Sequence, residues 1–286
     1  MADPAGKGGA AVRDALTKKV GQSMDIVVQS ALPFAPWADA RTRRLPGILP
    51  LDLCEWLKVD DVYAGQMALR DRLIADRPAE VIGHISTATQ AIDELYDFTL
   101  SRLPEGFHRH GQTVIRPDGV TVTLDAARPL HTLGRLVQED LCLMQEDGAG
   151  EHLLSAAVLC FPAGWRLHEK LGRPLMRMHR PVEKYTEDVG LRVQRLMDAV
   201  HVEAPLWRAN AHLSRAPLFN PLSEDAPKDT TDQSDMPFVR SERQCLIRLP
   251  RTRAVLFSIH TYLVRIRDLT PDQSAALAEF PIHRAQ

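Results

Sequence analysis

The chain has 286 residues, of which 44% are hydrophobic and 25% are charged, a composition typical of a globular protein. Its 35 basic and 37 acidic residues give a net charge of -2, which excludes the strong field that draws a protein onto nucleic acid. The longest apolar runs, such as 153–162 and 254–264, are about half as long as a membrane-spanning helix, so no membrane protein is expected.

The chain has four cysteines, which lie far apart and form no CxxC pair: Cys54, Cys142, Cys160 and Cys245. Isolated cysteines of this kind are typical of reduced, buried thiols in a cytoplasmic protein. Without a CxxCH motif, covalent attachment of a c-type haem is excluded, and any haem would be held non-covalently.

Residues 1–23 are rich in Gly, Ala and Lys, and we expect them to form a disordered extension. Residues 24–286 are expected to form one domain, with a mobile loop near 223–236 where Ser, Asp, Lys, Thr and Pro predominate. The apolar periodicity predicts helices over 54–75 and 79–103. A strand, a tight turn and a second strand are predicted over 113–124.

Further along, the pattern predicts a helix over 130–144, a strand covered on both sides over 153–162, and a helix over 187–200. Residues 238–249 and 254–264 are joined by 250–253 and form the clearest predicted β-hairpin. Helices followed by an antiparallel meander predict an α+β fold, in which helices flank the sheet and gather on one side of it.

The most unusual segment follows the strand that ends at Cys160. It places His179 in a stretch stiffened by Gly172, Pro174 and Pro181, among apolar neighbours. A haem-ligating imidazole needs such a backbone, although a surface or capping histidine is the commoner interpretation. Cys160 itself is a candidate thiolate ligand, but a buried cysteine in a strand usually serves only packing.

The second candidate region is the predicted hairpin. Alternation along 238–249 places Arg243 with the apolar side chains, so we expect it to be buried beside an anion. The anion could be a haem propionate, a substrate carboxylate, Glu139 or a carboxylate of a helix. Arg240 lies on the polar face and is the weaker candidate, because such charges are usually solvated. His260 could line a haem pocket or be a core histidine with satisfied hydrogen bonds.

Several ordered blocks resemble the haem-dependent oxidative N-demethylase α-subunit family: FPAGW at 161–165, EKLGRPL at 169–175, HRPV at 179–182, and further blocks at 56–63, 136–141 and 241–252. The resemblance covers roughly residues 33–264. It implies a PAS-like antiparallel sheet that binds haem b. It also implies oxygen-dependent demethylation of a small alkylamine, with electrons supplied by flavin and iron–sulfur reductase subunits.

On this resemblance His179, in the HxPV block, is the expected proximal iron ligand, with His168 as second choice. Trp165 and His260 would lie beside the cofactor, and Arg243 and Arg240 would be residues of the catalytic site. The chain departs from the family pattern at Ala211, where a Trp is expected, and at Cys245, where a Thr is expected. Because both lie near the expected pocket, they bear on the identity of the substrate and not on the haem.

Two other functions remain open from the sequence. A PAS-like domain can be a non-catalytic sensor of haem or of another ligand, since a fold alone does not establish catalysis. The chain could also be a structural protein that has lost haem.

Overall fold

The computed structural model describes residues 26–44, 46–180, 186–227 and 232–283. The expected disordered extension, 1–23, lies outside these residues, as do residues 228–231 of the expected loop. The strands are β1 (Leu49–Pro50), β2 (Ile82–His84), β3 (His108–His110), β4 (Thr113–Ile115), β5 (Thr121–Thr123), β6 (Asp140–Glu146), β7 (His152–Val158), β8 (Leu206–Ser214), β9 (Phe238–Arg248) and β10 (Val255–Arg265).

The α-helices are α2 (Tyr63–Asp76), α3 (Pro78–Val81), α4 (Thr89–Leu100), α5 (Pro129–Gly134), α6 (Leu167–Lys170), α7 (Leu175–Met178), α8 (Glu187–Ala199) and α9 (Pro271–Glu279). Short 3-10 helices lie at Leu53–Glu55, Ser86–Ala88, Gln233–Asp235 and Ile266–Asp268. Helices and antiparallel strands therefore mix in one chain, which confirms the α+β class.

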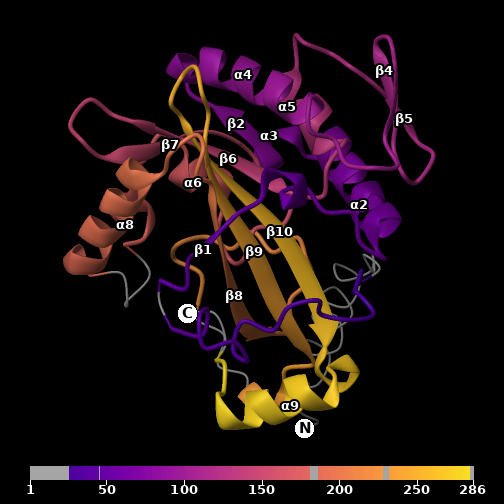
Figure 1. Ribbon diagram of the computed structural model, residues 1–286, viewed down its shortest axis with the longest axis vertical. Helices are drawn as coiled ribbons and strands as arrows, with labels where there is room; N and C mark the ends of the chain where they lie inside the picture. Colours follow the sequence, from indigo (N-terminus) through magenta and orange to yellow (C-terminus); the bar gives the residue numbers. More distant parts are fainter. Residues whose placement is uncertain (1–25, 45, 181–185, 228–231, 284–286) are drawn as a thin grey trace, which may run out of the picture.

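The large sheet has the order β1-β8-β9-β10-β6-β7-β2, and all its neighbouring strands are antiparallel (Figure 1). The strands β3, β4 and β5 form a separate small sheet. The predicted hairpin is confirmed as β9 and β10, which pair over their whole length from Phe238 opposite Arg265 to Arg248 opposite Val255.

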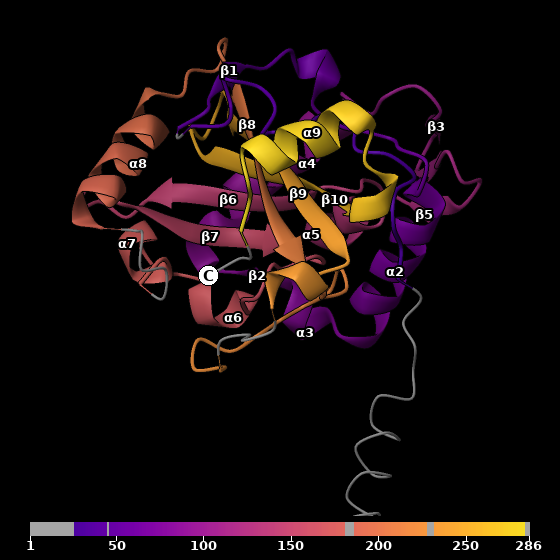
Figure 2. The ribbon, with the colours of Figure 1, turned by 90° about the horizontal axis from the view of Figure 1, so that it is seen from below.

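Helices cover both faces of the large sheet, and not one face as the sequence indicated. On the face that we call the α2 face, Leu141 and Leu256 pack in one apolar cluster with side chains of α2, α4 and α5. On the opposite face, the α8 face, Cys142 and Leu246 pack with side chains of α6, α7 and α8. Figure 2 shows α9 on one side of β9 and β10, and α6 and α7 on the other.

Two predicted helices are shorter than expected, and each region contains a glycine in close contact with a neighbouring side chain. The helix expected over 130–144 ends at Gly134, where an added Cβ would lie 2.6 Å from Val158 Cγ2, and the chain then forms β6. The helix expected over 79–103 is interrupted by β2, in which an added Cβ at Gly83 would lie 3.0 Å from Leu171 Cδ2. The helix expected over 54–75 begins only at Tyr63.

The predictions for the other regular elements hold. Strands form within 113–124 and 153–162, and α8 occupies 187–199 of the predicted 187–200. Three of the four cysteines are buried and Cys54 is exposed, and all four are free thiols, as expected. The strand β8, in contrast, forms where no element was predicted.

A buried ion pair joins α2 to the sheet. Arg70 Nη1 donates to Asp140 Oδ1 at 2.7 Å, and the two side chains are 0% and 1% exposed. The same carboxylate accepts hydrogen bonds from the backbone N–H groups of Cys160 and Phe161, at 2.7 and 2.8 Å. Asp140 thus positions the chain as it leaves β7.

The end of α8 is held by a side chain from β9. The guanidinium of Arg248 donates to the carbonyl oxygens of Met197, Asp198 and Val200 in and after the last turn. These carbonyls have no partner within the helix, so the arginine supplies the hydrogen bonds that the helix end lacks.

We expect Arg70→Met to lower the free energy of unfolding by about 3–5 kcal/mol, because it leaves the Asp140 carboxylate buried without its partner. Urea unfolding followed by circular dichroism measures the change. Arg72→Met, at an exposed position of the same helix, is the matched control and should change stability by about 0.5 kcal/mol or less. Equal effects of the two substitutions would contradict the role of the ion pair.

Candidate functional site

The side chains of β9 alternate between the two faces of the sheet and place the two candidate arginines on opposite sides. Arg243 lies opposite His260 of β10, on the α2 face. Arg240 lies on the α8 face. The expected alternation along β9 is therefore correct. The expectation that Arg240 is solvated is wrong, because helices cover its face of the sheet and Arg240 is 2% exposed.

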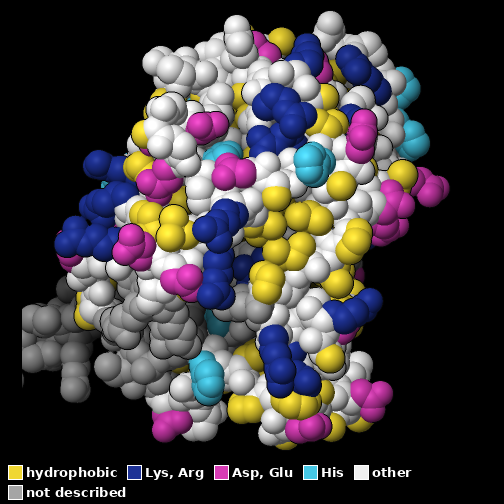
Figure 3. All heavy atoms as spheres, turned by 60° about the vertical axis from the view of Figure 1, so that its left-hand side comes forward, with side chains coloured by type: hydrophobic (Ala, Val, Ile, Leu, Met, Phe, Trp, Pro, Cys, Tyr) yellow, Lys and Arg dark blue, Asp and Glu magenta, His cyan; other side chains and the backbone are white. Residues whose placement is uncertain are grey.

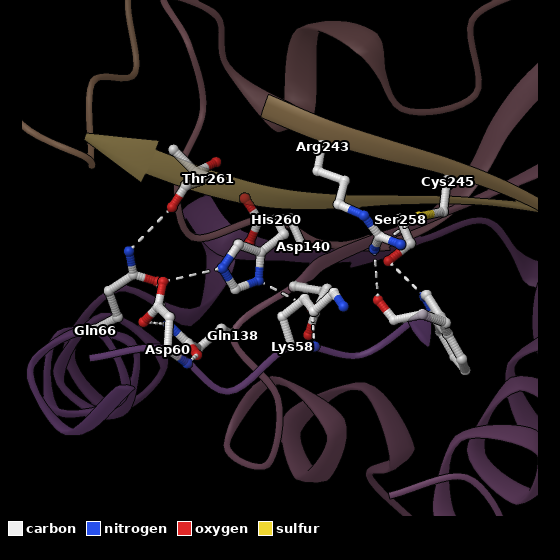
Figure 4. A network of polar contacts seen from close by, with 12 residues as sticks. Lys58, Asp60, Gln66, Gln138, Asp140, Arg243, Cys245, Ser258, His260 and Thr261 are labelled. Atoms are coloured by element: carbon white, nitrogen blue, oxygen red, sulfur yellow. Dashed lines mark hydrogen bonds and ion pairs between the residues drawn. The ribbon is translucent and has the colours of Figure 1, made fainter. Parts of the chain in front are cut away.

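On the α2 face, His260 lies between two carboxylates (Figure 4). Its Nδ1 is 3.0 Å from Glu139 Oε1, and its Nε2 is 3.2 Å from Asp60 Oδ2. Burial disfavours the charged ring, but the hydrogen bonds with Asp60 and Glu139 outweigh this effect and raise the pKa of His260 to about 9. At neutral pH His260 is an imidazolium and offers no lone pair to a metal.

Amide side chains orient this ion-pair network. Gln138 Nε2 donates to Asp60 Oδ1 at 2.8 Å and to Gln66 Oε1 at 3.0 Å. Although burial opposes ionisation of Asp60, the hydrogen bond and charge of His260 and the hydrogen bond from Gln138 lower the pKa of Asp60 to about 2. The backbone N–H of Lys58 donates to Glu139 Oε1 at 2.8 Å. The network thereby holds residues 58–60 against β10.

Arg243 has different partners from those expected. It donates to the carbonyl oxygens of Glu55 and Trp56 at 2.8 and 2.9 Å, and to Cys245 Sγ at 3.3 Å. Among the described residues it forms no ion pair, and the carboxylate of Glu139 is bound to His260 instead. Arg243 is half-buried and not buried as expected, and no protein carboxylate among the described residues is its partner.

A cavity of about 430 Å³ adjoins this network. It lies between residues 29–34, residues 58–61 and the α2 face of β8, β9 and β10, and its lining includes Phe34, Asp60, Asp61, Trp207, Arg243 and Tyr262. The volume falls within the range of roughly 300–1,000 Å³ that is typical of small-molecule sites.

On the α8 face, β8 and β9 carry a second polar cluster centred on Glu242. Its carboxylate accepts from Arg240 Nε at 3.3 Å, from Gln244 Nε2 at 3.0 Å and from Asn210 Nδ2 at 3.3 Å. Arg240 also donates to Phe161 O at 2.5 Å, which connects the cluster to the segment that follows β7.

At two neighbours of Glu242, burial outweighs the favourable charge of its carboxylate. Burial lowers the pKa of His212 to about 4, so its imidazole is neutral at neutral pH. Burial likewise lowers the pKa of Arg208, whose Nε has no hydrogen-bond partner among the described residues. The buried hydroxyl of Thr261 in β10 also lacks one there. Unpaired buried donors of this kind indicate a place for a further acceptor.

His179 follows α7, whose Leu175 packs in the apolar cluster of the α8 face. His179 Nδ1 lies 2.9 Å from Leu175 O, which accepts a hydrogen bond only if Nδ1 carries the proton. Burial lowers the pKa of His179 despite this bond, so the ring is neutral, with its lone pair on Nε2. Pro181, expected to stiffen this segment, lies outside the described residues.

The backbone just before His179 is fixed by Lys170. Its buried ammonium donates to Met178 O at 2.5 Å and to Glu224 Oε1 at 2.8 Å. Trp165 is half-buried against the same apolar cluster, whereas His168 is exposed on α6. The structure therefore brings Trp165 and His179 to the α8 face and directs His168 to the surface.

Cys160 is completely buried after β7, and burial raises the pKa of its thiol to about 12. Arg70 opposes this shift without cancelling it. A neutral, buried thiol is a poor source of the thiolate that iron would bind.

Basic, acidic and histidine side chains are mixed on the flank shown in Figure 3, and no single charge dominates it. Among the residues with a described position, no group of three or more His, Cys, Asp or Glu side chains could hold a metal ion. A haem iron takes only its axial ligands from the protein, so this observation does not bear on haem. In the same residues, no helix is long and apolar enough to cross a membrane.

The sequence did not point to Glu242, Arg208 or His212. The signal that could have found two of them is the alternation of polar side chains along Arg208, Asn210 and His212, which is a period of two in a strand. The partners of these side chains come from β9, about 30 residues later, and single-sequence patterns do not reveal that pairing.

These features define an α+β protein with buried titratable groups on both faces of its sheet, a class in which cofactors and small molecules commonly bind. The family model described as haem-dependent oxidative N-demethylase, alpha subunit-like, matches residues 47–280, and the chain belongs to that family. The matched residues include both polar clusters, His179 and the segment after β7.

The imidazolium of His260 makes stability depend on pH. Its folded pKa of about 9 exceeds the ordinary value of 6.5, so its contribution is complete below pH 6.5 and is lost as the pH rises to 9. The difference corresponds to about 3 kcal/mol. Asp60, with its pKa lowered to about 2, changes stability only in acid, below its ordinary value of 3.8.

We therefore expect the wild type to lose about 3 kcal/mol more stability than His260→Gln between pH 6 and pH 9.5. Urea unfolding of both proteins at the two pH values measures the difference. If both proteins show the same pH dependence, His260 is not an imidazolium in the folded state.

Proposed function

We propose that this chain binds one haem b on the α8 face of its sheet and acts as the oxidative N-demethylase component of a multi-subunit system. Its substrates would be a small alkylamine and dioxygen, and flavin and iron–sulfur subunits would supply electrons. The observation that carries the proposal is the neutral His179, which donates from Nδ1 to Leu175 O within a chain of this family. Metal-bound histidines commonly donate their second N–H to a backbone carbonyl in this way.

The residues on this face fit a haem. His179 would hold the iron through Nε2, and Trp165 would contact the porphyrin. A haem propionate would satisfy the buried Nε of Arg208, and Arg240 lies on the same face. Bound haem supplies the activation of oxygen, while the protein binds and orients the amine.

The titratable groups of β8 and β9 can position a substrate beside the cofactor. Glu242 is ionised, since the charge of Arg240 lowers its pKa despite its burial. Neutral His212 has one ring nitrogen that donates a hydrogen bond and one that accepts. A carboxylate is suited to bind a protonated alkylamine, and the accepting nitrogen of an adjacent neutral imidazole is suited to orient its N–H group.

The order of the strands supports the PAS-like part of this proposal. The hairpin β6-β7 precedes α6, α7 and α8, and the meander β8-β9-β10 follows them and returns to β6. The same order would suit a non-catalytic haem sensor. Amine-dependent consumption of oxygen by the haem-loaded protein with added flavin and iron–sulfur reductases distinguishes the enzyme from the sensor.

We expect His179→Ala to abolish haem binding, or to weaken it at least tenfold, while His168→Ala has little effect, because His168 is exposed on α6. Titration of the apoprotein with haem, followed at the Soret band, measures both affinities, and far-ultraviolet circular dichroism checks folding. An unchanged spectrum in His179→Ala, with loss in a His168, His260 or Cys160 variant, would show that another residue binds the iron.

We expect Arg240→Met to lower haem affinity more than Arg243→Met does, by about tenfold, because Arg240 lies on the α8 face and Arg243 on the α2 face. The sequence alone favoured the opposite order. The same Soret titration compares the two variants, and thermal unfolding identifies any loss of fold. A larger effect of Arg243→Met would place the haem on the other face of the sheet.

A further inference from the structure

The cavity on the α2 face is separate from the proposed haem site. The sheet lies between them, since Arg243 and Tyr262 line the cavity on one face, while α7 and the side chain of Arg240 lie on the other. The cavity is walled by residues 29–34, by residues 58–61 and by three strands of the sheet. Nothing in the haem chemistry proposed above uses it.

Arg243 presents unused hydrogen-bond donors to this cavity. A guanidinium has five N–H groups. Nη1 donates to Trp56 O and Cys245 Sγ, and Nη2 donates once, to Glu55 O. The N–H of Nε and the second N–H of Nη2 have no partner among the described residues. In a guanidinium, Nε and Nη2 form one edge of the planar group, and such an edge can bind both oxygens of a carboxylate.

The charges around the cavity leave Arg243 without a counterion. Asp60 is matched by the imidazolium of His260, and Lys58 forms an ion pair with Glu55. Asp61, at an exposed position, accepts a hydrogen bond from the backbone of Ser30. No carboxylate within the described ranges forms an ion pair with Arg243, so an anion in the cavity would be the first to do so.

The other walls suit a flat apolar body. Arg243 Cζ lies 5.4 Å from the centre of the Trp207 ring, and Phe34 contacts that ring edge-on at 5.2 Å between centres. The Tyr262 hydroxyl has no hydrogen bond to any described residue. Burial raises the pKa of Tyr262, so this hydroxyl stays protonated and can donate.

We propose that this cavity binds a small aromatic carboxylic acid in its anionic form. The carboxylate lies on the free edge of Arg243, and the ring lies against Trp207 and Phe34. The ligand is a free acid and not a propionate of the haem, because the sheet separates Arg243 from the face on which His179 lies.

Isothermal titration calorimetry of the full-length protein with benzoate, benzamide and benzylamine tests the charge preference. We expect one benzoate per chain, with at least tenfold weaker binding of benzamide and no binding of benzylamine. Haem-free and haem-loaded protein should bind benzoate equally. Preference for benzylamine would overturn the proposal in favour of a cation site at Asp60 and Asp61. Loss of benzoate binding on haem loading would overturn it in favour of a propionate at Arg243.

Three variants locate the binding. Arg243→Met should lower benzoate affinity at least tenfold, and Ala209→Leu should do the same by filling the cavity from β8 without removing the guanidinium. Arg267→Met, whose side chain is 79% exposed, is the control and should bind as the wild type does. If Arg243→Met does not fold, Ala209→Leu decides alone. Wild-type affinity in Ala209→Leu, or no saturable binding of benzoate to the wild type, would disprove the site.

Discussion

The ion pair between Arg70 and Asp140 is the interaction on which both candidate sites depend. One carboxylate binds a guanidinium of α2 and two backbone N–H groups after β7. It therefore fixes α2, which supplies Gln66 to the network on one face, and Phe161, whose carbonyl holds Arg240 on the other. Because both partners are buried, loss of either leaves an uncompensated charge that the surrounding apolar side chains cannot solvate.

The sheet separates two kinds of electrostatic environment. On the α2 face, an imidazolium lies between two carboxylates that accept further hydrogen bonds, and in this network of His260, Asp60 and Glu139 the buried Glu139 Oε2 has no partner among the described residues. On the α8 face, Arg208 Nε and the Thr261 hydroxyl lack partners among the described residues. Unsatisfied buried donors are a feature of sites that bind a ligand. The unpaired donors of Arg208 and Thr261 support the placement of haem on the α8 face.

Helices and strands with a clear local periodicity were predictable from the sequence. The hairpin of β9 and β10 and the helix α8 have strong periodicities, and the alternation along β9 correctly separated Arg240 from Arg243. The failures have tertiary causes. The helix expected to run through Asp140 ends at Gly134, which lies too close to Val158 for a side chain, and Asp140 lies instead in β6, where it pairs with an arginine 70 residues earlier. The burial of Arg240 depends on helices covering a second face, which one strand's pattern does not reveal.

The hydrogen bonds from Arg248 to the end of α8 affect the order in which these elements fold. The helix has 13 residues, of which only Gly190 and Met197 are buried, so it is marginal on its own. Its last carbonyls are satisfied by a guanidinium that lies about 50 residues further along the chain. On the ribosome α8 therefore emerges well before the residue that completes it. It reaches its final stability only when β9 has been synthesised and has joined the sheet.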